Sequence, residues 1–305
     1  MTEAERALWL EDRKKSIGGS DAAAIIGLSK YATPYTVWAD KTGKLPPQED
    51  NEAMRQGRDL EDYVAKRFCE ETGKRVKRHN QIIRNDKYPF AHATIDRKVI
   101  GEDAGLECKT TTTLNLKQFK NGEYPDNYYV QCVHYMAVTG LKRWYLAVLV
   151  LGKGFFVYTI ERDEDEINAL MNAESDFWNK YVVTDLPPPA DGLAPTSSAI
   201  NKCFPTSVDE TIDLSHMHNN FRKLEEINKQ ISLLTAARNE CIQTIKVEMA
   251  DCGTGQCGDY TANWKGQTRF VISKSLLQQH YPEVDINKVI KIAKFRRFTV
   301  KKELN

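Results

Sequence analysis

The chain has 305 residues and a formal net charge of +1, so its average charge neither indicates nor excludes a nucleic-acid partner. A chain of this length typically holds about two domains. It contains no run of about 20 apolar residues, which argues against a membrane span. Its N-terminus mixes acidic and basic residues and has no long apolar stretch, which predicts no secretory signal. Seven cysteines without a framework spacing predict reduced thiols, so we expect a cytoplasmic protein.

The N-terminal residues predict a helix over 2–14 that carries Trp9 and Arg13 one turn apart. A glycine turn follows in the sequence IGGSDAAAI and leads into a short helix, for which Ser20 is the expected N-cap. Backbone N–H groups at such a helix start form an anion site. From the residues alone, a capped helix without further function is the simpler interpretation.

Two further helices are predicted, over residues 35–41 and 52–72. The longer one has an apolar face and ends at Gly73. Glu61 lies beside that face, where a glutamate is most often an ordinary surface residue. Strands are expected over 76–83, 91–100 and 106–111.

The stretch from residue 90 to 110 is the centre of the prediction. Two β-rich segments flank a glycine-punctuated turn, which predicts a hairpin that brings Asp96 close to Glu107 and Lys109. Because side chains alternate along a strand, Glu107 and Lys109 share one face and Cys108 lies on the other. Two carboxylates that can hold Mg²⁺ and an ammonium that can position a water suit hydrolysis of a phosphodiester.

A helix over 127–138 places Gln131 and Tyr135 on one face, four residues apart. Strands over 143–150 and 155–160 and a helix over 164–181 complete a predicted α/β sandwich.

The C-terminal part has a different pattern. Residues 184–208 are rich in Pro, Ser and Thr and predict a linker. A long amphipathic helix over 221–245 follows, whose apolar seam needs the first domain, the short helices after it or another subunit as partner. A hairpin is expected from strands 259–264 and 268–272, then a basic tail over 291–302 that is either a solvated face or a nucleic-acid patch. Cys252 and Cys257 allow a zinc interpretation, but no complete ligand set has regular spacing.

The chain resembles the PD-(D/E)XK superfamily in an ordered set of motifs: Gly57-x₃-Glu61, Asp96, Glu107-x-Lys109 and Gln131-x₃-Tyr135. More narrowly, and with the IGGSDAAAI block in addition, it is similar to the YqaJ and lambda exonuclease family of phage recombination nucleases. The resemblance covers roughly residues 5–181. It implies a restriction-endonuclease-like α/β core with a central mixed sheet flanked by helices, followed by a helical, coiled-coil-like and β-hairpin extension. The corresponding domains are 1–183, the linker 184–208 and a C-terminal domain 209–305.

By this resemblance the chain is a Mg²⁺-dependent 5′→3′ double-strand DNA exonuclease, with Mn²⁺ able to substitute. The implied metal ligands are Asp96, Glu107, the backbone carbonyl of Cys108 and Glu61, the last through water or a second metal. Lys109 and Gln131 complete the catalytic set. The residues implied to hold the DNA end are Arg13 and Ser20 at the 5′-phosphate, Trp9 as a wedge at the terminal base pair, and Thr94 and Tyr135.

The implied partners are double-stranded DNA ends, a single-strand annealing protein and further copies of the chain in a trimeric ring, in the cytoplasm of a bacterial host. Two alternatives stay open. One is a structure- or sequence-specific endonuclease on the same core, and the other is an inactive DNA-end-binding scaffold. The sequence departs from the family pattern at Thr94-Ile95-Asp96-Arg97, where Ser-Pro-Asp-Gly is usual.

Overall fold

A computed structural model of the chain describes residues 3–47, 50–79, 81–112, 116–119, 121–268 and 273–284. The chain divides into two compact units, Met1–Thr206 and Ser207–Asn305. No helix among the described residues is both long enough and apolar enough to cross a membrane. Each unit is described by itself below.

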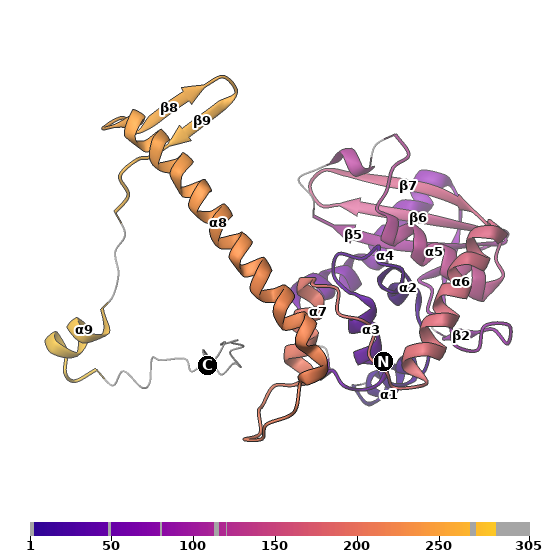
Figure 1. Ribbon diagram of the computed structural model, residues 1–305. Coiled ribbons are helices and arrows are strands. Elements are labelled where there is room, and N and C mark those ends of the chain that lie inside the picture. Colours follow the sequence, from indigo (N-terminus) through magenta and orange to yellow (C-terminus); the bar gives the residue numbers. More distant parts are fainter. Residues whose placement is uncertain are drawn as a thin grey trace. The chain divides into compact units, whose positions relative to one another are not determined.

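The first unit begins with three helices, α1 (Glu3–Lys14), α2 (Gly19–Ile25) and α3 (Pro34–Lys41) (Figure 1). Thr33 caps α3, because its hydroxyl accepts a hydrogen bond from the backbone of Thr36. The expected N-cap of α2 was wrong. Gly18 holds that position, and its N–H donates to a side-chain oxygen of Asp21 at 2.9 Å. Ser20 already lies in the first turn of the helix and is exposed.

The long helix α4 (Glu52–Thr72) matches its predicted bounds. Asn51 caps its start by accepting from the backbone N–H of Met54, and Gly73 ends it with φ of 70°, a left-handed conformation that glycine adopts without strain. Its buried residues Val64, Ala65 and Phe68 face the sheet.

The main sheet has five strands in the order β1-β4-β5-β6-β7. Its strands are β1 (Val76–Arg78), β4 (Arg97–Val99), β5 (Ala104–Thr111), β6 (Arg143–Val150) and β7 (Gly154–Glu161). Only β5 and β6 are parallel, so the sheet is mixed, as expected. The strands expected over 76–83 and 91–100 are each interrupted. Their other halves, β2 (Ile83–Arg84) and β3 (His92–Ala93), pair with each other apart from the main sheet.

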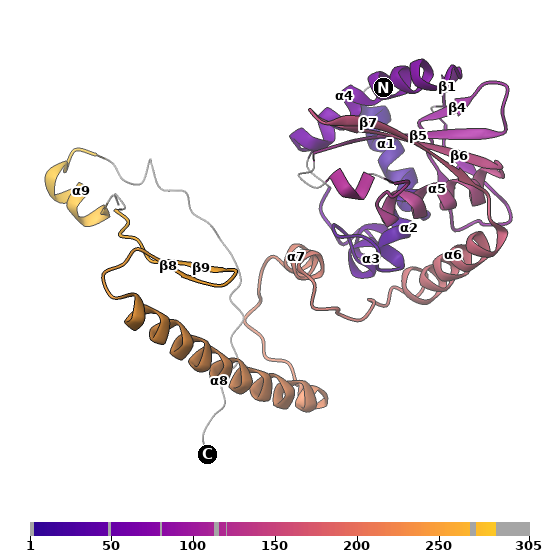
Figure 2. The same cartoon turned by 90° about the horizontal axis from the view of Figure 1, so that it is seen from above.

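Helices cover both faces of the sheet (Figure 2). One face packs on α4, and the other on α5 (Asp126–Thr139). Behind α5 lie α2 and α6 (Glu164–Phe177), and a π-helical turn (Trp178–Val182) continues α6. A short 3₁₀ turn occurs in this unit at Leu116–Phe119, and another lies in the second unit at Ser215–Met217. The first unit is therefore an α/β sandwich whose core lies on both sides of β5 and β6.

The segment 184–208, expected to be a linker, contains a helix, α7 (Ala194–Cys203). Pro195 occupies its first turn, where proline is tolerated because the missing N–H needs no partner there. The helix packs on α3: Ala199 joins the apolar cluster around Trp38, and Thr196 exchanges a 2.7 Å hydrogen bond with Thr33. The segment is therefore helical because its residues pack on the surface of α3, a contact that the composition of the segment alone does not predict.

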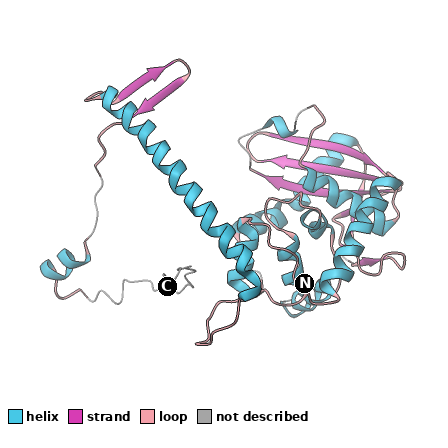
Figure 3. Cartoon of the chain, in the orientation of Figure 1, coloured by secondary structure: helices cyan, strands magenta, loops and turns pink. Residues whose placement is uncertain are grey.

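The described part of the second unit contains α8 (His218–Met249), a hairpin of β8 (Thr254–Cys257) and β9 (Tyr260–Asn263), and α9 (Lys274–His280) (Figure 3). The expected long helix is present as one unbroken element. The expected hairpin was placed too far along the chain, because the strand 260–263 pairs with residues before it, across Gly258 at φ of 55°. The basic tail 291–302 and most of the expected strand 268–272 lie outside the described residues.

Candidate active site

The β4–β5 hairpin brings the predicted carboxylates together. Asp96 immediately precedes β4, and its carboxylate accepts a 2.8 Å hydrogen bond from the backbone N–H of Cys108 on β5. On β5, Leu106 and Cys108 pack with the cluster beneath α4, whereas Glu107 and Lys109 contact Gln131 of α5. The period-two alternation therefore places the side chains as the sequence predicts.

A closed set of contacts fixes these side chains. The Lys109 ammonium lies 2.6 Å from Glu107 Oε1 and donates to Gln131 Oε1 at 2.8 Å. Gln131 Nε2 in turn donates to Glu107 Oε1 and to the Tyr135 hydroxyl, both at 2.8 Å. The amide of Gln131 therefore accepts from the Lys109 ammonium and donates to the Glu107 carboxylate, and so fixes the two charged groups relative to each other.

The site concentrates negative charge in a desolvated place. Burial, the charge of Glu107 and that of Glu61 raise the pKa of Asp96 well above its ordinary value. Burial also raises the pKa of Glu107, against the opposing effect of Lys109. Burial alone would lower the pKa of Lys109, but the charge of Glu107 outweighs it and raises the pKa, so the ammonium stays protonated.

Glu107 also has an atom without a partner. Its Oε2 is buried and finds no hydrogen-bond donor among the described residues, and the carboxyl group as a whole lies within hydrogen-bonding reach of Asp96, a second carboxyl group. Buried polar atoms are rarely left unsatisfied, and two adjacent carboxylates are stabilised by a divalent cation. The all-oxygen donors of Asp96 and Glu107 fit Mg²⁺, which typically uses one or two carboxylates and completes its shell with water and substrate phosphate.

Glu61 lies at the edge of this cluster and is engaged elsewhere. It forms an ion pair with Arg97, whose guanidinium is almost fully buried and also reaches Asp62. Arg97 further donates to the backbone carbonyl of Asp96 at 2.7 Å. Among the described residues, no group of three or more His, Cys, Asp and Glu side chains is placed to hold a metal. Sequence reasoning registered Arg97 only as a missing glycine, although its position next to Asp96 marked it as a neighbour of the site.

Tyr135 is buried, and its hydroxyl accepts a hydrogen bond from Gln131. Its ring centroid lies 5.2 Å from that of Trp144, with the two ring planes tilted by 40°. Gly19, at the start of α2, packs directly on Tyr135 and Gln131. A Cβ at this position would lie 2.6 Å from the Tyr135 ring and 3.1 Å from Gln131 Cγ. Gly19 is therefore required by close helix packing, a reason that the sequence pattern alone does not reveal. Sequence reasoning also missed Tyr128, whose ring lies 5.4 Å from the Lys109 ammonium.

Tyr135, one of the residues predicted to hold a DNA end, is buried on α5. The others lie on the N-terminal helices and in the loop before β4. Arg13 stacks its guanidinium over the Trp9 ring at 4.6 Å. Ser20 is exposed on α2, and Thr94 is half-buried between β3 and β4. These side chains form no hydrogen-bonded cluster comparable to that around Gln131 in the described contacts.

Lys41 ties α3 to this region. Its ammonium lies 2.6 Å from Asp21 and donates to the backbone carbonyl of Arg13 at 3.3 Å. Next to them, His92 is fully buried; its Nδ1 shares a 2.9 Å hydrogen bond with Ser16, and its Nε2 has no partner in the described structure. Burial and the charges of Lys41 and Arg13 lower the pKa of His92 to about 3, so the ring is neutral.

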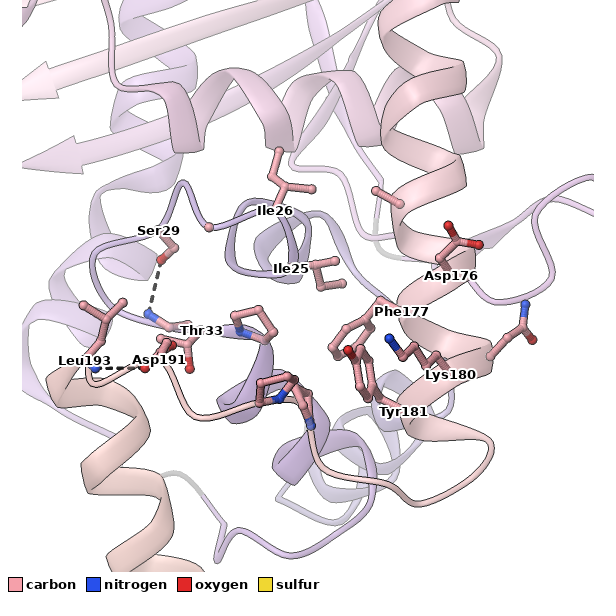
Figure 4. A pocket seen from close by; sticks show the side chains of 17 residues that line it. Ile25, Ile26, Ser29, Thr33, Asp176, Phe177, Lys180, Tyr181, Asp191 and Leu193 are labelled. Carbon is pink, nitrogen blue, oxygen red and sulfur yellow. Dashed lines mark hydrogen bonds between the residues drawn. The ribbon is translucent and has the colours of Figure 1, made fainter. Parts of the chain in front are cut away.

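A cavity of about 900 Å³ opens elsewhere on the first unit, between the loop after α2 and the π-helical turn after α6 (Figure 4). Apolar residues such as Ile25, Phe177 and Tyr181 line it, with Asp176 and Lys180 on one side. None of the catalytic, metal-binding or DNA-binding residues predicted from the sequence lines this cavity. The carboxylates around Gln131, not this cavity, carry the chemistry that the sequence predicts.

Comparison with known proteins gives matches in sequence and in structure. A family model described as the YqaJ-like viral recombinase domain matches residues 8–142. The uncharacterized protein YqaJ of Bacillus subtilis (strain 168) is 40% identical over 307 residues, which cover 98% of this chain and 95% of that protein.

Among solved structures, LHK-Exo in complex with dAMP is 20% identical with a TM-score of 0.50, over 59% of this chain and 94% of that one. A second structure, the alkaline exonuclease LHK-Exo from Laribacter hongkongensis, is 19% identical with a TM-score of 0.48 over the same shares. The first of these likenesses shows that the matched part of this chain shares the mixed α/β fold of that structure. Taken with near-complete coverage at 40% identity, the comparisons show that this chain belongs to the YqaJ family.

Proposed function

We propose that the chain is a Mg²⁺-dependent nuclease that degrades duplex DNA from its ends, as a 5′→3′ exonuclease of a phage or prophage recombination system. The proposal is carried by the Glu107 carboxyl group, which lies next to Asp96 and the fixed ammonium of Lys109 and whose buried Oε2 finds no hydrogen-bond donor in the described structure. The family membership and the names of the structural neighbours support the same chemistry.

In this proposal, Asp96, Glu107 and the backbone carbonyl of Cys108 hold the cation. A bound Mg²⁺ would polarise the scissile phosphate and lower the pKa of the attacking water, so that the water loses a proton more readily and becomes a stronger nucleophile. Mn²⁺ would substitute, because it accepts the same oxygen donors.

The chain's own residues do the positioning. Lys109 orients the attacking water and offsets the charge that develops on the phosphate, in the geometry that Gln131 fixes at 2.8 Å. Tyr135 keeps the Gln131 amide in place from behind, in contact with Gly19. Glu61, which is paired with Arg97, acts at the edge of the site through water.

Arg13 and Ser20 would hold the 5′-phosphate together with Thr94, and Trp9 would stack on the terminal base pair. A guanidinium suits this task because it binds phosphate through two parallel hydrogen bonds. Hydrolysis from that end would leave a 3′ single strand for an annealing protein. By analogy with the resembled family, copies of the chain would enclose the duplex as a trimeric ring in the cytoplasm of a bacterial host.

The test is a time course with Mg²⁺ on linear duplex DNA labelled at either the 5′ or the 3′ end, beside a closed circular duplex. We expect progressive loss from 5′ ends while the circle stays intact. Cutting of the circle would replace the proposal with an endonuclease. Binding of ends without hydrolysis, in Mg²⁺ and in Mn²⁺, would replace it with an inactive scaffold.

A further inference from the structure

The long helix α8 carries an apolar stripe that the described residues of its own unit leave uncovered. Large apolar side chains along it are exposed, among them Leu234 at 71% and Ile231 at 55%. The contacts that the described hairpin makes with α8 lie at the end of the helix, where Met249 is buried and Lys246 lies 5.0 Å from the Trp264 ring. A helix with such a stripe is not stable bare in water, so a partner must cover it.

The spacing of the stripe defines the partner's shape. From Leu224 onward, the seam residues alternate at three and four positions, which is the 3.5-residue repeat of a coiled coil. The seven seam positions are Leu224, Ile227, Ile231, Leu234, Arg238, Cys241 and Ile245. Such a repeat packs on another helix of the same period and similar length.

Among the described helices, α8 itself fits this requirement. The next longest, α4, has its apolar side buried against the sheet, and α9 is only 7 residues long. The positions that flank the seam between residues 228 and 244 are uncharged: Asn228, Gln230, Thr235, Ala237, Ile242 and Thr244. Two identical copies would therefore meet no like-charge repulsion along their shared edge.

Arg238 decides the orientation. In a parallel pair it would face Arg238 of the partner subunit inside the seam, and two guanidinium groups would be forced together. In an antiparallel pair with its two-fold axis between Ile231 and Leu234, Arg238 lies opposite the partner's Ile227. The two arginines are then about 16 Å apart along the axis, at about 1.5 Å per residue.

We propose that α8 pairs with the α8 of a second copy of this chain as an antiparallel two-stranded coiled coil. In this register Leu224 packs on the partner's Cys241, and Ile231 packs on the partner's Leu234. A pairing of this kind has two-fold symmetry and closes on itself. It does not depend on the nuclease activity proposed above.

The first test measures the mass of the full-length protein by sedimentation at micromolar concentration. Leu234→Asp places a charge in the middle of the seam, and we expect the particle mass to fall to half of the wild-type value. The matched control is Leu233→Asp, one residue away, at a similarly exposed leucine outside the seam (64% against 71% exposed). It should leave the mass unchanged. A monomeric wild type, or equal masses for wild type and Leu234→Asp, would overturn the proposal.

The second test reads the register directly and leaves the seam largely intact. In Leu224→Cys, a short bis-maleimide should join the new thiol to the partner's Cys241, and mass spectrometry of the peptides identifies the link. Within one helix these positions are about 26 Å apart, so the link can only join two copies. A link between Cys241 and the partner's Cys241 in the wild type would show a parallel pair and overturn the proposal.

Discussion

Two regions of the first unit were both singled out by sequence, and they differ in how they are held. Around Gln131, every charged group of the site has its position set by another member of the cluster. On α1 and α2, Arg13 rests on Trp9, and Ser20 points to the surface. The first region is preorganised for chemistry, whereas the described side chains of the second form no such cluster, as expected of residues whose proposed partner is a DNA end.

Loss of the lysine should have the largest effect. We expect Lys109→Ala to lower hydrolysis by roughly 10²–10³-fold or more, because the developing charge loses its fixed cation. DNA binding should change little, since the rest of the surface is untouched. The control is Lys98→Ala on the adjacent strand β4, assayed on end-labelled duplex and by a binding titration. Equal hydrolysis by wild type and Lys109→Ala would remove the lysine from the mechanism.

The two regions meet at Gly19, and this contact can be broken on its own. Gly19→Ala places a methyl group against the Tyr135 ring, which forces Tyr135 and Gln131 to move. We expect a loss of about 1–3 kcal/mol in the free energy of unfolding, together with a loss of hydrolysis.

The matched control for this change is Gly57→Ala in α4, where a Cβ meets no atom within 4 Å. It should instead stabilise the protein by about 0.5–1 kcal/mol. Denaturant unfolding and the hydrolysis assay measure both variants. If Gly19→Ala unfolded and hydrolysed DNA like the wild type, the packing of α2 on Tyr135 would not matter to the site.

A more selective effect is expected at the N-terminal helix. Arg13→Ala should remove the preference for 5′-phosphorylated over 5′-hydroxyl ends. We expect the ratio of hydrolysis rates on the two kinds of end to fall by roughly tenfold to a hundredfold, which corresponds to the free energy of one charge-assisted hydrogen bond. Lys15→Ala is the control, since that ammonium is largely exposed two residues further on. A uniform loss on both kinds of end would contradict a role in reading the phosphate.

The smallest effect concerns pH. The folded pKa of His92, about 3, lies below the ordinary value of 6.5, so the unfolded chain binds a proton that the folded chain rejects. Stability should therefore fall as the pH drops below 6.5, by up to about 1.4 kcal/mol per pH unit. We expect His92→Asn to show a shallower fall between pH 6.5 and 5, measured by denaturant unfolding.

The control for the pH experiment is His216→Asn, at an exposed histidine of the second unit. Its stability profile should follow that of the wild type. A wild-type profile that is flat across the same window, or unchanged in His92→Asn, would mean that the buried ring is not the source of the pH dependence.

Much of this arrangement follows from local pattern. Period-two alternation placed Glu107 and Lys109 together, and a four-residue helical spacing placed Gln131 above Tyr135. These relations depend on secondary structure alone. The bounds of α4 and β6 were predicted for the same reason, since strong periodicity and clear end signals determine both.

Other features depend on contacts between distant segments and could not be predicted in this way. Gly19 is explained by a tyrosine more than a hundred residues away, and Arg97 by the two acids of α4 that it holds. By composition, the strand 260–263 could form a hairpin with the segment before it or with the segment after it. The structure pairs it with the earlier segment, Thr254–Cys257. The helix α7 likewise depends on the surface of α3.

In the proposed site, Glu107 and Asp96 hold a divalent cation while Glu61 stays paired with Arg97. Calorimetric titration of Mn²⁺ into the protein without DNA tests this arrangement independently of activity, with Glu107→Gln, Asp96→Asn and Glu61→Gln beside the wild type. We expect both Glu107→Gln and Asp96→Asn to abolish measurable binding and Glu61→Gln to retain it. Binding of Mn²⁺ to Glu107→Gln with the wild-type affinity would contradict the account.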